Sequence, residues 1–351
     1  MKNNLVFIPS FSLEPNKLVA YNSLYYKSSV VDNSTSLLSN IHDIRKVNKR
    51  YVTNKQVKRK HHNWTLSANG YRTLKRRINW LYYLSKSRHV KTYSGKDIFN
   101  FRMCFLTLTL PSKQNEPTIE LNKKLINPFL TEIKQRTKME NYVFKLEFQN
   151  NGNAHWHFVT DTYLDYFLVL KIWNRLLKKH GYIKPYSEKM NKLKLSDYVK
   201  MRNKHSEVDY ATCVKAYAKG KRENWEQPNS VDLKSVTSEG SISYYISKYF
   251  GKGFDIKCAC NENDTPENSS SIRLWFSSRS LSKLNSISNF CEAVKYDIFS
   301  IVSHAKEYRK FLTDYAVVIL FEIKSMTGNA RKWIEMLLKD YSKKQGYIPA
   351  A

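Results

Sequence analysis

The stretch YVFKLEFQNNGNAHWHFVT, residues 142–160, decides the fold. It predicts two strands, 142–149 and 153–160, because apolar and polar residues alternate on both sides of a polar turn. Alternation of this kind is typical of strands that bury one face and leave the other free. We therefore expect a β-hairpin with a core face and a second face available for chemistry.

The length of the turn decides which side chains share a face. With a two-residue turn, Glu147 would lie opposite Trp156. With a three-residue loop, the last position favours a positive φ, which Gly152 accepts, and Glu147 instead lies opposite His155. The second register gathers the polar side chains of the hairpin on one face, namely Lys145, Glu147, His155 and His157.

This polar face has the composition of a metal site. His155 and His157 are two residues apart on a strand, so both imidazoles point the same way. A His-x-His pair by itself also fits an ordinary core. Together with Glu147 the pair supplies two imidazoles and a carboxylate, which suit Mg²⁺ or Mn²⁺ and leave coordination positions open. We therefore expect a divalent metal ion at Glu147, His155 and His157.

The charge of the chain points to a polyanionic partner. Its 351 residues include 59 Lys and Arg against 30 Asp and Glu, a formal net charge of +29. Arg45 to Lys91 contains fifteen Lys and Arg and no acidic residue. Part of it predicts a basic amphipathic helix after Ser67, with Arg72 and Arg76 on its polar side. A solvated charged face is the alternative, but without acidic residues we favour phosphate contact.

Composition excludes several classes of protein. Hydrophobic residues make up 42% of the chain, enough for a core, and no apolar run approaches the length of a membrane span. The polar start MKNN lacks a signal-peptide core, and five scattered cysteines suggest reduced thiols. We expect a soluble cytoplasmic protein that does not bind membranes.

Further segments suggest a mixed architecture of three parts. Residues 1–60 predict a basic, partly disordered arm, 61–285 the main domain, and 286–351 an α/β extension of unknown role. Outside the hairpin, the predicted strands are 102–110, 272–276 and 315–323, and the predicted helices are 166–179, 241–250 and 329–341. Residues 191–226 are polar and basic, and we assign them only to an insertion or loop.

The predicted helix within SISYYISKYFGKG, residues 241–253, carries tyrosines at its border. Tyr245 and Tyr249 lie one helical turn apart, next to Lys248. Their rings can belong to an apolar stripe packed on the sheet, which spacing alone favours. Their hydroxyls can also act as a pair of nucleophiles beside an ammonium group.

Three motifs in this order, FLTLTLP, HWH and YISKY, resemble the HUH endonuclease superfamily. The Tyr-x-x-Lys-Tyr pattern is similar to two-tyrosine replication initiators of microvirus-like single-stranded DNA phages. The resemblance implies an α+β fold with an antiparallel sheet flanked by helices. It also implies His155, His157 and Glu147 as metal ligands and Tyr245 and Tyr249 as nucleophiles assisted by Lys248. Tyr244 departs from the pattern, because it could replace one of the pair.

The same resemblance implies contacts and partners. The segment 272–284 is similar to an arginine-rich strand of these proteins, so Arg273 and Arg279 join Arg72, Arg76 and Lys145 as predicted nucleic-acid contacts. We expect nicking and rejoining of single-stranded DNA at a replication origin, in a bacterial cytoplasm if the gene belongs to a phage or plasmid. The sequence has no Walker A motif, so a host helicase and polymerase would complete replication. Plasmid mobilisation, transposition and non-catalytic binding of single strands through stacking aromatics are the rival functions.

Overall fold

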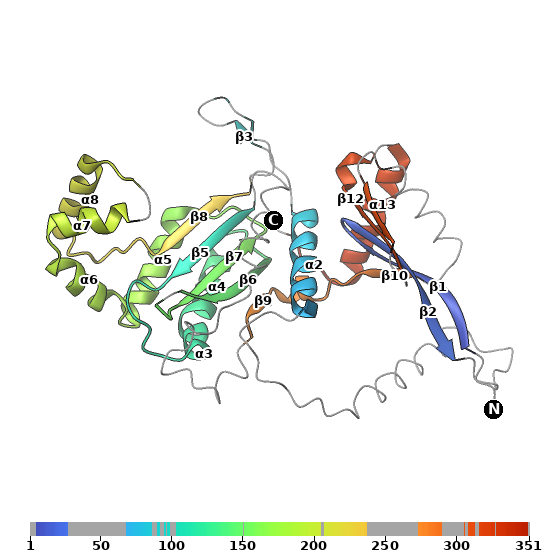
Figure 1. Ribbon diagram of the computed structural model, residues 1–351, viewed down its shortest axis with the longest axis horizontal. Coiled ribbons are helices and arrows are strands. Elements are labelled where there is room, and N and C mark those ends of the chain that lie inside the picture. The colour runs from blue at the N-terminus through green and yellow to red at the C-terminus, as the bar shows by residue number, and fades with distance from the viewer. Residues whose placement is uncertain are drawn as a thin grey trace. The chain divides into compact units, whose positions relative to one another are not determined.

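The computed structural model forms two compact units, Met1–His62 with Lys283–Tyr347, and Asn63–Ser282 with Ile348–Ala351 (Figure 1). The structure describes residues 5–26, 68–85, 90–91, 95, 97–98, 103–149, 151–204, 207–236, 273–289, 305, 308–312, 316–326 and 328–349. The predicted helix 241–250 lies outside these residues. Both units combine helices with an antiparallel sheet, which confirms the predicted α+β class with flanking helices.

The sheet of the second unit has five antiparallel strands in the order β8-β5-β7-β6-β9. Its strands are β5 Cys104–Thr109, β6 Tyr142–Phe148, β7 Ala154–Thr160, β8 Val231–Ser235 and β9 Trp275–Ser277. A separate two-stranded ribbon pairs β3 Val90–Lys91 with β4 Asp97–Ile98. The predicted strands 102–110, 142–149 and 153–160 are therefore confirmed within one or two residues.

The β6–β7 hairpin has the predicted three-residue register. Glu147 lies opposite His155, and the Gln149 amide donates to the Asn153 carbonyl oxygen at 2.9 Å. Gly152 has a φ of 81°, the left-handed conformation that its lack of a side chain permits. The glycine thereby fixes which side chains face the core and which face the site.

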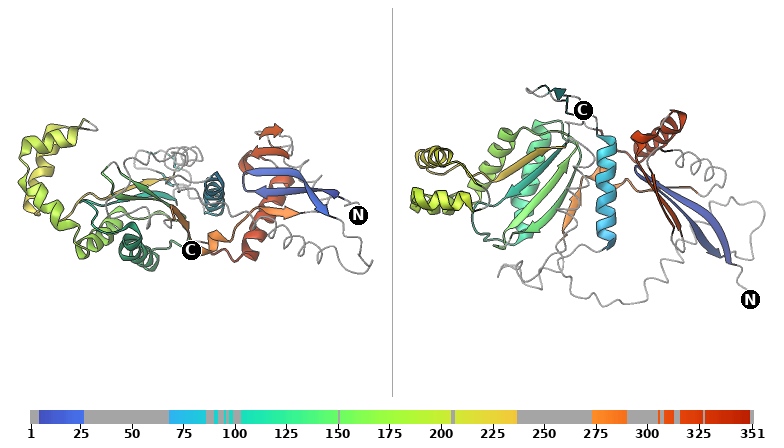
Figure 2. Two further views of the ribbon diagram at one scale, coloured as in Figure 1. Left: turned by 60° about the horizontal axis from the view of Figure 1, so that its bottom comes forward. Right: turned by 45° about the horizontal axis from the view of Figure 1, so that its top comes forward.

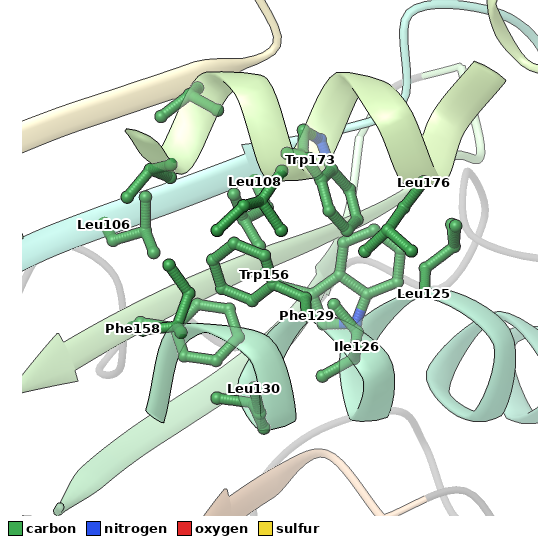
Figure 3. Packing of buried hydrophobic residues seen from close by; sticks show 14 of the residues in the cluster. Leu106, Leu108, Leu125, Ile126, Phe129, Leu130, Trp156, Phe158, Trp173 and Leu176 are labelled. Carbon is green, nitrogen blue, oxygen red and sulfur yellow. The ribbon is translucent and has the colours of Figure 1, made fainter. Parts of the chain in front are cut away.

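Helices cover one face of this sheet (Figure 3). These helices are α3 Thr118–Leu121, the π-helical turn η1 Asn122–Ile126, α4 Asn127–Arg136 and α5 Tyr166–Lys179. Trp156 of β7 and Phe129 of α4 pack against the Trp173 ring of α5 with centroid distances of 5.9 and 5.8 Å. The Trp156 indole also donates to the Asn122 side chain at 2.9 Å, so the large ring is anchored at the π-helical turn.

Helix α5 begins and ends as its sequence predicts. The Asp165 carboxylate accepts a hydrogen bond from the Leu168 amide at 2.8 Å and caps the first turn. At the other end Gly181 adopts a φ of 80°, and the Tyr182 amide reaches back to the Leu177 carbonyl oxygen. This pairing is the Schellman arrangement, which stops the helix and turns the chain.

The second unit contains five further helices. They are α2 Ala68–Leu84, α6 Ile183–Lys192, α7 Leu195–Asn203, α8 Tyr210–Arg222 and α11 Arg279–Ser282. Helix α2 corresponds to the predicted basic helix. Helices α6 to α8 occupy most of the segment 191–226, to which sequence patterns assigned only an insertion or loop, and they share a small core built around Tyr198 and Trp225.

The first unit joins both ends of the chain in a second five-stranded antiparallel sheet, ordered β10-β1-β2-β12-β11. Its elements are β1 Leu5–Glu14, β2 Lys17–Tyr26, β10 Ile287–Asn289, β11 Tyr308–Leu312, β12 Ala316–Phe321, the 3-10 turn Ile323–Ser325 and α13 Gly328–Lys344. Figure 2 shows β1 and β2 as a long hairpin.

This pairing corrects the predicted division of the chain. Residues 5–26 form strands, although they were assigned to a partly disordered arm, and they pair with the segment treated as a separate extension. Side chains of both segments are buried, among them Leu13, Leu18, Ile319 and Leu338. No helix in the described part of the chain combines the length and apolar character needed to cross a bilayer.

Candidate metal and nucleic-acid site

The open face of the β5–β7–β6 sheet carries two rows of polar side chains. The first row runs Thr107, His157 and Lys145, and the second runs Thr109, His155 and Glu147. Each row crosses the three strands through directly paired residues, so neighbouring side chains point the same way. The predicted polar face is therefore real, and β5 adds two threonines to it.

The two threonines fix the histidine rings. Thr107 Oγ1 lies 3.1 Å from Nδ1 of His157, and Thr109 Oγ1 lies 3.1 Å from Nδ1 of His155. The imidazoles meet edge to face with centroids 4.4 Å apart. Because each hydroxyl engages Nδ1, each ring is left with Nε2 as the atom that can bind a ligand.

Glu147 links the two rows. Its Oε1 accepts a hydrogen bond from Lys145 Nζ at 2.8 Å, and its Oε2 lies 3.2 Å from His157 Nε2. Burial alone would raise the pKa of Glu147, but the His157 hydrogen bond and the Lys145 charge outweigh it and lower the pKa. The carboxylate is therefore ionised at neutral pH, as a metal ligand must be.

Lys145 occupies a different place from the one predicted. Its side chain is fully buried, and its ammonium forms an ion pair with Glu147. Burial lowers the pKa of Lys145, against the opposing charge of Glu147. This position does not suit the predicted contact with nucleic acid, because the ammonium lies beneath the surface and already neutralises a carboxylate. Lys145 instead holds Glu147 beside the histidines.

His155 is the more accessible histidine. Its side chain is partly exposed, whereas His157 is buried. Burial and the neighbouring His157 lower the pKa of His155 to about 4, so its imidazole is neutral at physiological pH. Among the described residues, Nε2 of His155 has no hydrogen-bond partner, which leaves a lone pair available to a ligand.

The donor set fits a divalent ion, although the side chains are not yet arranged around one. Within the described ranges, no group of three His, Cys, Asp or Glu residues forms a ready metal-binding cluster. The reason at this face is visible, because Glu147 is turned toward Lys145 and His157 rather than toward a point shared with His155. Two neutral-imidazole nitrogens and an ionised carboxylate nevertheless match the chemistry of such an ion.

The predicted arginine contacts lie at different ends of the sheet. Arg273 is exposed, and its guanidinium lies 5.0 Å from the ring centre of Trp275, which pairs with Lys145. It precedes β9 at the end that carries Glu147. Arg279 follows β9 and is exposed at the opposite end, beyond the pairing of Ser277 with Val143. The arrangement brings Arg273, but not Arg279, toward the histidines.

The remaining predicted residues fall into two groups. Arg72 is exposed and Arg76 partly exposed on helix α2, so both guanidinium groups are accessible to a ligand. Tyr245, Lys248 and Tyr249 lie outside the described residues.

The threonines are the residues that sequence reasoning missed. Thr107 and Thr109 alternate with leucines in FLTLTLP, a pattern that does place them on one face of a strand. Which face they share, and with which histidine, depends on the pairing of β5 with β7 across nearly fifty residues of sequence. That long-range register carries no local signal.

Comparison with known proteins gives one match. Residues 103–254 match the family model of the replication-associated protein ORF2. No curated protein and no solved structure matches the chain. The matched span includes the threonines, Glu147, both histidines and the segment with the paired tyrosines. Over these residues the chain is similar to replication-associated proteins, and this similarity favours a role in starting DNA replication.

Proposed function

We propose that this protein is a metal-dependent tyrosine nickase of the HUH type that starts rolling-circle replication of a single-stranded DNA element. One observation carries the proposal. His155, His157 and Glu147 share an accessible sheet face within the segment that is similar to replication-associated proteins. In that same segment, Tyr245 and Tyr249 offer nucleophiles at helical spacing.

The residues of the polar face have separate roles in this proposal. Nε2 of His155, Nε2 of His157 and the Glu147 carboxylate would hold a Mg²⁺ or Mn²⁺ ion, which polarises the scissile phosphate when bound. Thr107 and Thr109 keep Nδ1 of each ring occupied. Lys145 keeps Glu147 ionised and in place.

The chemistry assigned to the tyrosines is transesterification. The phenolic oxygen of Tyr245 or Tyr249 attacks the scissile phosphorus, a 5′-phosphotyrosyl bond forms, and the bond from phosphorus to the 3′ oxygen breaks. The phenolic proton is released, and the 3′ oxygen leaves as a hydroxyl that can prime synthesis. In the reverse step a 3′ hydroxyl attacks the phosphotyrosine and frees the enzyme. Since one phosphoester replaces another, rejoining requires no nucleotide cofactor.

Two tyrosines suit a replication cycle. Residues four apart on a helix lie about 6 Å apart along its axis, so both hydroxyls can reach one phosphate in turn. One tyrosine holds the first 5′ end while the second cuts the regenerated origin. Lys248 is the third member of this group, beside both tyrosines. Unwinding and synthesis would fall to host enzymes in the cytoplasm.

Covalent trapping tests this proposal. The full chain is incubated with labelled single-stranded oligonucleotides in Mn²⁺ or in EDTA and then resolved on denaturing gels. We expect an adduct only with metal, and peptide mapping should place the DNA on Tyr245 or Tyr249. A variant with both tyrosines changed to Phe is the matched control and should form none. Tight binding without any adduct would instead favour the non-catalytic binder, and an adduct at Tyr244 would refute the tyrosine assignment.

A further inference from the structure

The three-helix insertion α6–α8, residues 183–222, adds no strand to the catalytic sheet. It has a separate core, in which the rings of Tyr198 and Tyr217 pack against Trp225 at centroid distances of 5.3 and 6.0 Å. Gly220 is required there, because a Cβ atom at that position would lie 2.4 Å from the Trp225 ring. A core of this kind gives the insertion a defined shape.

The insertion is also fixed to the sheet. The buried side chain of Asn174 in α5 donates to the Pro228 carbonyl oxygen at 3.1 Å and accepts from the Ser230 hydroxyl at 2.7 Å. Lys178 adds an ion pair to Glu226 at 2.8 Å. The segment that returns from α8 to β8 is therefore held on α5 by several contacts.

This anchoring places the insertion at the end of the sheet that carries the site. The Thr109 amide donates to the Ser230 carbonyl oxygen at 3.0 Å, and Thr109 is paired with His155 on its other side. Figure 1 shows α6, α7 and α8 grouped beyond the start of β8. A strand of nucleic acid that passes the histidines at this end has the insertion in its neighbourhood.

One side of α8 has a composition suited to phosphates. Lys215, Lys219 and Arg222 follow at spacings of four and three residues, so they share one exposed side of the helix. The exposed residues between them are small, namely Ala211, Thr212 and Ala218. Small residues between long basic ones allow a phosphate chain to approach the helix closely, whereas a protein-binding surface is usually rich in aromatic residues and poor in Lys.

Ordinary roles do not account for this side of α8. Basic residues in a last turn complement the helix dipole, which explains Arg222 and Lys219 but not Lys215 in the middle of the helix. The contact of Lys219 with Glu223 is long, at 4.0 Å. Lys221, by contrast, turns inward and donates to the Asn191 carbonyl oxygen. The exposed side thus keeps three positive charges and carries no acidic residue from Tyr210 to Arg222.

We propose that this side of α8 binds the phosphodiester backbone of the DNA that leads to or from the nicking site. The inference rests on the proposed function, which supplies DNA as the ligand. It goes further in assigning a phosphate-binding role to a segment for which the sequence predicted only a loop or insertion.

The test removes the three charges and measures binding. The full chain with Lys215→Gln, Lys219→Gln and Arg222→Gln keeps residues that favour helix. The matched control, Lys332→Gln, Lys339→Gln and Lys343→Gln, removes the same charge from exposed positions of α13. Equilibrium binding of a labelled oligonucleotide, single-stranded in one arm and duplex in the other, is measured against salt without cleavage. Thermal melting verifies that both variants are folded.

We expect the α8 variant to reduce the slope of log K against log salt by about two to three, with the larger change if the contacts are to duplex. Affinity should fall roughly a hundredfold at about 0.1 M salt, whereas the α13 control should change only a few-fold. Equal behaviour of the two variants, or unchanged binding by the α8 variant, would overturn the inference and leave an acidic protein partner as the better occupant.

Adduct formation by the unsubstituted protein is a separate readout. A protein that forms the adduct and keeps its salt slope after the α8 changes contradicts this inference alone. A reduced slope without any adduct contradicts the nickase proposal and supports the phosphate-binding surface.

Discussion

The two ends of strand β7 both carry polar groups, but the neighbours treat them differently. At the Thr160 end, Asp161 is buried and accepts hydrogen bonds from the amide and the side chain of Asn141, each at 2.8 Å. At the other end, His155 is partly exposed, and among the described residues its Nε2 has no hydrogen-bond partner. A satisfied buried group holds a fold together, whereas an oriented and unsatisfied one is available to a ligand.

The Thr160 end is a closed polar network. Asn141 also donates to the Ile348 carbonyl oxygen at 2.6 Å, and its own carbonyl oxygen accepts from Ser278 at 3.2 Å. Cys104 lies 3.1 Å from the Thr160 hydroxyl, and burial raises the pKa of its thiol to about 11. Such a thiol is protonated and unreactive at neutral pH. These contacts connect the strand ends with the tail of the chain.

The largest effect is expected from the histidines. His155→Ala and His157→Ala should each reduce adduct formation below detection, because each removes one of two imidazole donors while the phosphate contacts lie elsewhere. Quantitative gels with Mn²⁺, alongside DNA affinity, measure this. Cys104→Ala at the other end of the strand is the control and should nick normally. Full activity of a folded His157→Ala would break the comparison between the ends.

Lys145 tests whether the site end also depends on a buried ion pair. Lys145→Met leaves Glu147 without its cation, and we expect a loss of about 3–5 kcal/mol in the free energy of unfolding. The double variant with Glu147→Gln should regain much of that loss, although it should not nick. Urea unfolding of the single and double variants measures both values. A Lys145→Met protein as stable as the original would show that the pair has no structural role.

Asp161 tests the Thr160 end by pH. Burial raises its pKa from 3.8 to about 6, against hydrogen bonds from Asn141 that lower it. Between these values the folded protein keeps a proton that the unfolded chain releases, so stability falls as the pH rises through this window. Relative to Asp161→Asn, the protein should lose roughly 3 kcal/mol from pH of about 3.5 to about 7. Urea unfolding across this range measures it, and a pH-independent difference would refute it.

The threonines give the smallest expected effect and the most specific one. Thr107→Val and Thr109→Val keep the side-chain shape but remove the hydroxyl from Nδ1, and we expect Mn²⁺ affinity to fall about 10–100-fold. The corresponding Ser variants should bind normally. Imidazole ¹⁵N shifts in the metal-free protein should show a mixed tautomer in the Val variants. Unchanged shifts and affinity would remove the threonines from the site.

Local patterns predicted the hairpin and the long helices because their signals lie within a few residues. Gly152 and the alternation around it give the Glu147–His155 register, and Asp165 and Gly181 give the bounds of α5. Pairing between distant segments has no such signal. The β1–β2 hairpin therefore went unrecognised, since its partners β10 and β12 lie near the other end of the chain.

The same distinction applies to the site. Glu147 and the two histidines come from one hairpin and were predicted together, whereas Thr107 and Thr109 join them through a long-range strand pair. The outcome for Lys145 differs for another reason. Alternation places it on the polar face, but only the structure shows that the face is covered there and that its ammonium pairs with Glu147.

The most direct test of the central claim is the location of bound metal. A crystal of the full chain soaked in Mn²⁺ gives an anomalous difference map, which identifies manganese without reference to activity. We expect one peak at the site end of the sheet, within about 2.2 Å of Nε2 of both His155 and His157 and with a Glu147 oxygen as a third ligand. A well-occupied peak elsewhere, with these three side chains free of metal, would contradict the account.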